Sequence, residues 1–131
     1  MEFFTPISEK EASLLNALTL AYVGDAVHSL YVRNKLVISS DSKIDDLHKA
    51  TSDVVKAETQ ARLAEKLFDS FTEQEQSVFL RGRNSSLRHK AKNQSAADYR
   101  KATGFEAVLG YLYLTGQTER LREILESTFI G

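Results

Sequence analysis

Apolar residues recur along the chain mostly at the three- and four-residue spacing of helices, and few segments alternate as strands do. One clear case begins at residue 44, where apolar positions define a single helical face with polar residues between them. These positions are Ile44, Leu47, Val54, Val55, Ala61, Leu63, Ala64 and Leu67. The only proline is Pro6, so nothing else in the chain forbids helix. The pattern predicts an all-α helical bundle, with residues 1–131 forming one domain.

A Ser or Thr followed three positions later by an acid marks a helix start, because the two side chains can bond backbone N–H groups there. Such pairs are Ser8 and Glu11, Ser42 and Asp45, Thr72 and Glu75, and Ser95 and Asp98. We therefore expect helices at about 8–35, 43–69, 72–82, 95–115 and 118–128. Gly24 and Gly104 are the points where two of them can break, and Gly116 with Thr118 separates the last two.

The composition fits a small cytoplasmic protein. Of 131 residues, 42% are hydrophobic, which is enough for one packed core. Cysteine is absent, which excludes disulfides and thiolate metal sites and suits a reducing compartment. The first residues lack the basic start and apolar run of a signal peptide. The least charged stretch, 12–32, contains several polar residues, so we expect a buried helix there and no membrane span.

The net charge of −1 conceals an uneven distribution. Residues 81–101 hold seven Lys or Arg and one acid, a net charge of +6, and the rest of the chain is net −7. Such a segment is typical of a polyanion contact, although a solvated loop is the alternative. Residues 81–98 contain no aromatic side chain for base stacking, so phosphates of a duplex are the expected ligand. The candidate RNA-binding residues are Arg81, Arg83, Arg88, His89, Lys90, Lys92, Arg100 and Lys101.

Two isolated acids stand in the most apolar helices. Asp25 is the only charged residue between positions 12 and 32, and Glu106 the only one between 102 and 118. Helices this apolar should meet at the centre of the bundle, where two carboxylates would repel each other unless a cation lay between them. Oxygen ligands favour Mg²⁺ or Mn²⁺. A helix cap or an exposed face is the structural alternative for either acid.

The histidines add little chemistry by themselves. His28 lies one turn after Asp25 and can be a hydrogen-bond partner near the metal, although a core role is more common for such a residue. His48 has metal-ligand spacing with Asp45, but its polar neighbours favour a solvated face. No catalytic triad, Walker loop or Rossmann glycine motif is present, so covalent catalysis is disfavoured.

The sequences around the two acids resemble the motifs of the ribonuclease III family. Residues 21–27, AYVGDAV, resemble its signature block, and residues 105–114, FEAVLGYLYL, resemble its second acidic block. The order and the separation of the two blocks make the resemblance specific, and it covers nearly the whole chain. It is closest to the compact form of the family, in which no double-stranded-RNA-binding domain follows.

This resemblance implies a homodimeric endoribonuclease that cleaves double-stranded RNA, with Asp25 and Glu106 as the catalytic and Mg²⁺-binding residues. It also implies that Tyr22 lies at the two-fold interface. The family substrate would be a precursor of large-subunit (23S) ribosomal RNA, with a large-subunit ribosomal protein as a further candidate partner. Three positions depart from the family pattern because they lack its acids: Leu18, Ala21 and Thr103.

Those missing acids leave two alternatives open. One is a non-catalytic duplex-RNA-binding or ribosome-associated protein with the same fold. The other is an all-α phosphohydrolase acting on small nucleotides, for which the basic segment would be superfluous.

Overall fold

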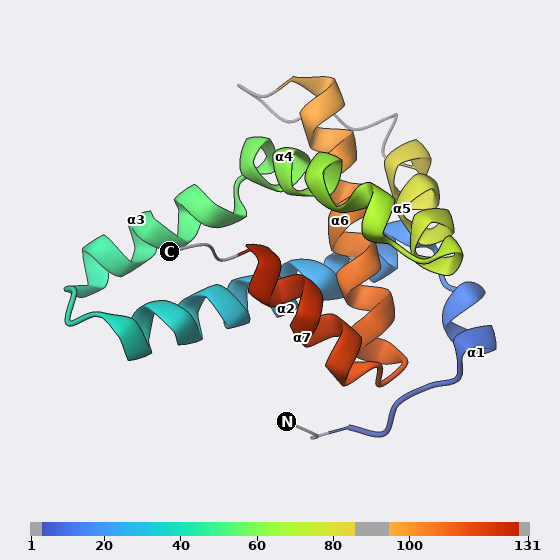
Figure 1. Cartoon of the computed structure of the whole chain (residues 1–131), viewed down its shortest axis with the longest axis horizontal. Helices are drawn as coiled ribbons and strands as arrows, with labels where there is room; N and C mark the ends of the chain where they lie inside the picture. Colours follow the sequence, from blue (N-terminus) through green and yellow to red (C-terminus); the bar gives the residue numbers. More distant parts are fainter. Residues whose placement is uncertain (1–3, 86–94, 129–131) are drawn as a thin grey trace.

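A computed structural model describes residues 4–85 and 95–128, and within these ranges the chain forms helices and no strand. The all-α prediction is therefore confirmed. The elements in chain order are α1 Glu9–Ser13, α2 Ala17–Ser39, α3 Ile44–Val55, α4 Ala57–Leu67, the 3-10 turn η1 Phe68–Ser70, α5 Glu73–Ser85, α6 Ala96–Leu114 and α7 Thr118–Thr128 (Figure 1). Of the predicted basic segment, residues 86–94 lie outside the described ranges.

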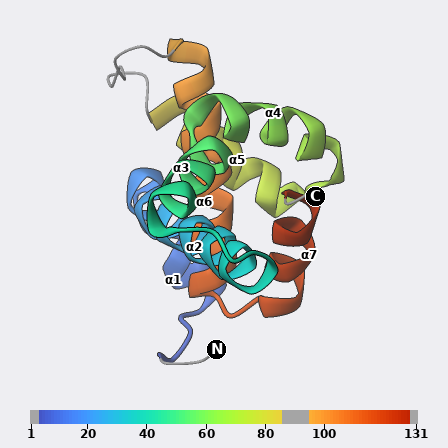
Figure 2. The ribbon, with the colours of Figure 1, turned by 90° about the vertical axis from the view of Figure 1, so that its left-hand side faces the viewer.

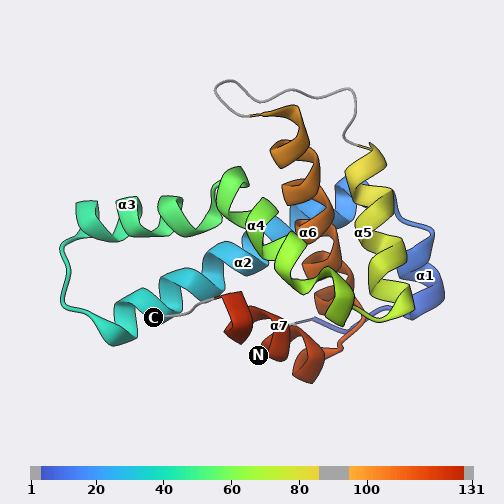
Figure 3. The same cartoon turned by 45° about the horizontal axis from the view of Figure 1, so that its top comes forward.

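Helix α6 runs through the middle of the molecule, with α2, α4 and α5 packed around it (Figures 1 and 2). Its second half is apolar on all sides, and Phe105, Val108, Leu109 and Leu112 are fully buried. A helix apolar all round has to be enclosed by others. In contrast, α3 buries only Thr51 and forms with the end of α2 a hairpin that extends to one side (Figure 3).

Two glycines set the crossing of α2 and α6. A Cβ atom at Gly24 would lie 1.7 Å from the carbonyl oxygen of Glu106, and one at Gly110 would lie 1.9 Å from that of Leu20. The two backbones therefore touch directly, with no side chain between them. Gly24 stays helical, so the break predicted there is wrong: its missing side chain serves packing, and the helix continues through it.

The first predicted helix, 8–35, is divided elsewhere. It separates at residues 14–16 into α1 and α2. Asn16 begins the second helix, since its side-chain oxygen accepts a hydrogen bond from the Leu18 N–H at 2.7 Å. Asparagine is among the strongest helix-capping residues, and here its cap defines a new start within a continuous apolar pattern.

The second predicted helix, 43–69, is also two helices. The backbone turns at Lys56, where ψ is 156°, so α3 ends and α4 begins around one extended residue. The predicted Ser42 cap is wrong too, because Lys43 occupies the N-cap of α3 and makes no side-chain cap hydrogen bond. Gly104 lies inside a continuous α6, so no break occurs there either.

The other predicted boundaries are confirmed by their hydrogen bonds. Ser8 with Glu11 and Thr72 with Glu75 each form the reciprocal pair of a capping box. The Ser95 hydroxyl accepts from the Asp98 N–H at 3.0 Å. The last two helices are separated at Gly116, whose φ of +71° is in the region that favours glycine.

A buried ion pair ties α5 to α7. The Arg120 guanidinium donates two hydrogen bonds of 2.9 Å to the carboxylate of Glu75, which is 2% exposed. Arg120 also donates to the Ser70 carbonyl oxygen at 2.9 Å. Because Glu75 also belongs to the capping box of α5, one carboxylate holds the helix start and its neighbour α7 together.

Candidate active site

Asp25 on α2 and Glu106 on α6 line the same cavity, as the isolated acids predicted. The cavity has a volume of about 270 Å³, and its other lining residues are Leu18, Ala21, Tyr22, Tyr99 and Thr103. The two acids meet because each is next to the glycine crossing, Asp25 following Gly24 and Glu106 contributing the carbonyl oxygen that faces Gly24. Asp25 is exposed and Glu106 half-buried. The expected location at the centre of the bundle is therefore wrong for Asp25, since the site opens at the surface.

The electrostatics of the pair favour an added positive charge. Burial, followed by the contact with the Asp25 side chain, raises the pKa of Glu106 to about 8. Within residues 4–85 and 95–128, no Lys or Arg forms an ion pair with either carboxylate. A carboxylate in such a place needs either a proton or a cation.

A third helix reaches Glu106 through Gln60 of α4. The Gln60 amide donates to Glu106 Oε2 at 3.2 Å, and its Nε2 also lies 2.9 Å from His28 Nδ1. Gln60 is 2% exposed and His28 is fully buried. His28 thus has the core position that is common for such a histidine, and its hydrogen bond leads toward Glu106.

Sequence reasoning missed Gln60, although a signal was present. The buried face of α4 consists of Ala57, Gln60, Ala61 and Ala64. A glutamine among three alanines on the core-facing side of a helix requires a buried partner. His48, the other histidine considered, is exposed on α3.

The donors present fit a magnesium ion better than a metal that needs a complete protein cage. No cluster of three or more His, Cys, Asp or Glu residues suitable for a metal occurs in the described part of the chain. Mg²⁺ commonly binds one or two carboxylates and keeps several waters or phosphate oxygens as its other ligands. The two carboxylates of this site, one of them carrying an elevated pKa, match that requirement.

Two of the positions that lack the family acids are filled by small buried side chains. Ala21 and Thr103 are 6% and 7% exposed, and the Thr103 hydroxyl donates to the Tyr99 carbonyl oxygen at 3.0 Å. Tyr22 lies at the rim of the cavity with 81% of its surface exposed. Its role at an interface stays a prediction.

Four of the eight predicted RNA-binding residues are described. The Arg81 guanidinium donates to the Leu15 carbonyl oxygen at 2.7 Å, which fastens α5 to the segment before α2. Lys101 forms a 2.7 Å ion pair with Glu65, and Arg83 donates to Asn84. Arg100 is half-buried on α6. The other four residues, Arg88, His89, Lys90 and Lys92, lie outside the described ranges.

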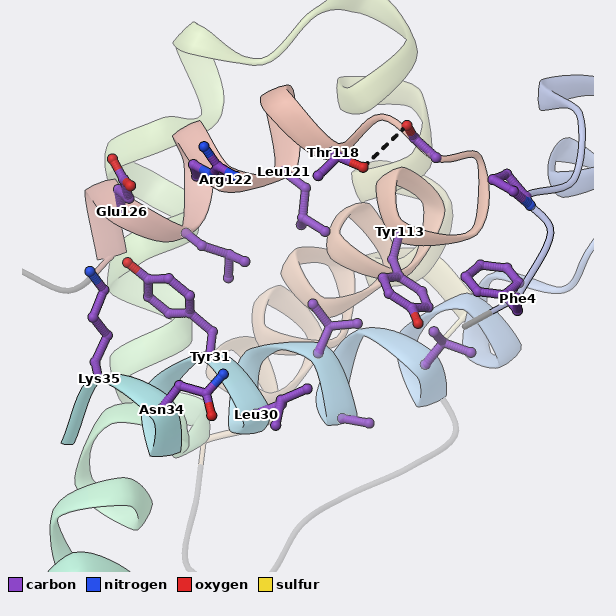
Figure 4. A pocket seen from close by; sticks show the side chains of 16 residues that line it. Phe4, Leu30, Tyr31, Asn34, Lys35, Tyr113, Thr118, Leu121, Arg122 and Glu126 are labelled. Carbon is purple, nitrogen blue, oxygen red and sulfur yellow. Dashed lines mark hydrogen bonds between the residues drawn. The ribbon is translucent and has the colours of Figure 1, made fainter. Parts of the chain in front are cut away.

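A larger cavity, of about 680 Å³, lies between α2, α7 and the N-terminal segment (Figure 4). Leu30 and Tyr31 of α2 face Leu121 and Arg122 of α7 across it. It contains neither Asp25 nor Glu106, so it is separate from the candidate active site. Nothing in the sequence had indicated it.

Comparison with known proteins agrees with this site. Residues 18–117 match the model of the ribonuclease III domain. The chain is 46% identical to the Mini-ribonuclease 3 of Thermoanaerobacter sp. (strain X514) over 93% of its own length and 87% of that protein. It is 43% identical to the Mini-ribonuclease 3 of Staphylococcus aureus (strain NCTC 8325 / PS 47), with 89% of each chain covered. The crystal structure of protein FN1578 from Fusobacterium nucleatum shares the fold, with a TM-score of 0.81 at 24% identity over 87% of this chain and 91% of that one.

The chain belongs to the ribonuclease III family. It is an endoribonuclease of the ribonuclease III type, and this family acts on double-stranded RNA and generally depends on divalent metal ions. The curated relatives reported above carry the name Mini-ribonuclease 3. Within the described ranges, no helix combines the length and the hydropathy that crossing a membrane would require.

Proposed function

We propose that Asp25 and Glu106 together bind Mg²⁺, for which Mn²⁺ can substitute, and that cleavage of double-stranded RNA takes place at this site. The observation that supports the proposal is the meeting of two carboxylates from separate helices in one open cavity, without a basic partner among the described residues. Bound there, the ion supplies Lewis-acid activation of the attacking water and neutralises charge that develops on the scissile phosphate.

The protein's own contribution is positioning. The direct contact of α2 and α6 fixes the backbones from which both carboxylates extend. The open side of the cavity, at the exposed Asp25, gives a phosphate access from solvent. With only two protein carboxylates in the site, phosphate oxygens of the RNA and water complete the coordination.

RNA is recognised mainly by shape in this proposal. A-form duplexes expose phosphates and 2′-hydroxyls across a wide minor groove, and segment 81–101 supplies a net charge of +6. Replacing Arg88, Lys90 and Lys92 together with Gln should weaken duplex binding and reduce the dependence of affinity on salt by about 0.9 per lost phosphate contact. Unchanged affinity would contradict this role and favour a small nucleotide as substrate.

The exposed Tyr22 supports a two-fold homodimer as the working unit. An aromatic side chain that is 81% exposed beside the site is a natural anchor for a second copy. Each site of the dimer would then cut one strand and leave a short 3′ overhang.

A base-paired stalk in the precursor of large-subunit (23S) ribosomal RNA is the proposed natural substrate, and the cytoplasm is the proposed location. This part of the proposal rests on the resemblance of the two acidic motifs to those of the family. A large-subunit ribosomal protein is the proposed accessory partner. Cells lacking the protein should accumulate 23S RNA with unprocessed ends, and primer extension of those ends measures this directly.

The test of the activity is a cleavage assay on a long RNA duplex with Mg²⁺. The unmodified protein should cut, whereas Asp25→Asn and Glu106→Gln should each reduce the rate by at least about 100-fold, since the removed charge acts on the transition state. Binding of the duplex by both variants would show that they remain folded. An unmodified protein that binds the duplex and never cuts it would instead be the non-catalytic relative.

A further inference from the structure

The amide of Gln60 stands between a buried imidazole and the carboxylate of Glu106. Its Nε2 lies 2.9 Å from His28 Nδ1 and 3.2 Å from Glu106 Oε2. The two hydrogens of one amide nitrogen suffice for both contacts. Three helices meet in this arrangement, because His28 belongs to α2, Gln60 to α4 and Glu106 to α6. The chain of contacts leads from the core to the proposed metal ligand.

The direction of these hydrogen bonds is fixed by chemistry. An ionised Glu106 carboxylate can only accept, so the amide must present its nitrogen. His28 Nδ1 must then also accept, which places the imidazole proton on Nε2. Burial lowers the pKa of His28 to about 4, so the ring is neutral and Nδ1 has a free lone pair. A reversed amide would bring its carbonyl oxygen against the carboxylate.

The surroundings hold both partners of the amide in place. The His28 ring packs edge-on against Phe105, with ring centroids 5.5 Å apart, and Phe105 precedes Glu106 in α6. His28 is fully buried and Gln60 is 2% exposed, so water does not compete for their hydrogen bond. Groups that bond to metal ligands from outside orient those ligands, and replacing them typically costs about 10–100-fold in metal affinity or activity.

We propose that Gln60 is a positioning residue for Glu106, with His28 orienting the Gln60 amide so that it donates to the carboxylate. The inference rests on the proposed function of Glu106 as a metal ligand. Gln60 itself touches neither metal nor RNA in this account. Its donated hydrogen bond restricts rotation of the carboxylate and stabilises the ionised form that binds a cation.

The test measures Mn²⁺ binding by electron paramagnetic resonance on purified protein without RNA. Gln60→Met keeps the length of the side chain and removes the donor, and it should weaken Mn²⁺ binding by about 10–100-fold. The matched control is Gln76→Met. Gln76 donates to the Phe68 carbonyl oxygen at 3.0 Å in another part of the fold, so the control loses the same kind of hydrogen bond and should bind Mn²⁺ normally.

A pair of His28 variants tests the orienting role and protects the experiment if Gln60→Met fails to fold. His28→Asn retains an oxygen acceptor where Nδ1 was and should keep most of the Mn²⁺ affinity. His28→Leu fills similar space without an acceptor and should lose affinity as Gln60→Met does. Equal affinities for Asn and Leu at this position would overturn the role of His28.

Ring ¹⁵N chemical shifts of His28 give a readout without metal. They should report a neutral ring protonated at Nε2, whereas a proton on Nδ1 would contradict the proposed direction of the hydrogen bonds. Unmodified protein that binds Mn²⁺ in an Asp25-dependent way, together with an unchanged Gln60→Met, would overturn the inference alone. Unmodified protein that binds no Mn²⁺ would overturn the proposed metal site, and the inference with it.

Discussion

Replacing Gly24 with alanine tests whether the backbone contact between α2 and α6 positions the two carboxylates. The added Cβ would lie 1.7 Å from the Glu106 carbonyl oxygen and 2.9 Å from the Gly110 nitrogen. Ordinary contacts begin at 3.4 Å, so the oxygen would have to retreat by about 1.7 Å. Both near atoms belong to backbone inside a helix, so no side-chain rotation can relieve the clash and the two helices must separate.

The separation should lower both stability and activity. Overpacking in a core costs about 1–3 kcal/mol, and a clash with backbone should reach the upper end of that range or exceed it. Asp25 follows the substituted residue and Glu106 carries the displaced oxygen, so the carboxylates move apart with the helices. A misplacement of about 1 Å can cost about 100-fold in rate. Urea unfolding and duplex cleavage at saturating Mg²⁺ measure the two effects.

Gly82→Ala is the matched control, because it also adds a methyl group where two helices cross. Its nearest atoms would be the Gly104 Cα at 2.9 Å and the Ala107 Cβ at 3.0 Å, a milder clash between α5 and α6. It should cost less stability and leave the cleavage rate of the folded protein close to normal. A Gly24→Ala protein with unmodified stability and cleavage would refute the reasoning about the crossing.

Three further predictions concern other parts of the structure. With a pKa of about 8, metal-free Glu106 is about nine-tenths protonated at pH 7, so Mg²⁺ binding should release close to one proton there and almost none at pH 9; calorimetry in buffers of different ionisation enthalpy measures this, and pH-independent release would contradict the elevated pKa. Arg120→Met should cost about 3–5 kcal/mol in urea unfolding because it leaves the Glu75 carboxylate buried and unpaired, whereas Arg122→Met, whose ion pair is exposed, should cost under about 1 kcal/mol. Tyr22→Ala should shift the mass seen by light scattering toward that of a monomer; an unaltered dimer would remove Tyr22 from the interface.

Local signals in the sequence predicted much of the fold. Capping pairs such as Thr72 with Glu75 act within four residues, so their hydrogen bonds could be anticipated from spacing alone. Gly116 was recognisable for the same reason, because a helix end needs only its own backbone angles. The break at Lys56 has no such signal, and the apolar face from residue 44 onward continues through it.

Features that depend on distant partners were not readable in this way. Gly24 was interpreted as a break because the sequence does not show Glu106 behind it. Gln60 and Arg120 look like ordinary polar residues until α4 meets α6 and α7 meets α5. Asp25 and Glu106 could be found because each is the only charge in its apolar helix, but their exposure could not, since it depends on which helices cover the crossing.

The central claim is that Asp25 and Glu106 share one divalent cation, and a crystal soaked in Mn²⁺ tests it most directly. Anomalous diffraction should place a manganese peak between the two carboxylates, in the cavity lined by Tyr99 and Thr103, and the peak should disappear in Glu106→Gln. Manganese bound elsewhere, or a peak that persists in Glu106→Gln, would contradict the claim.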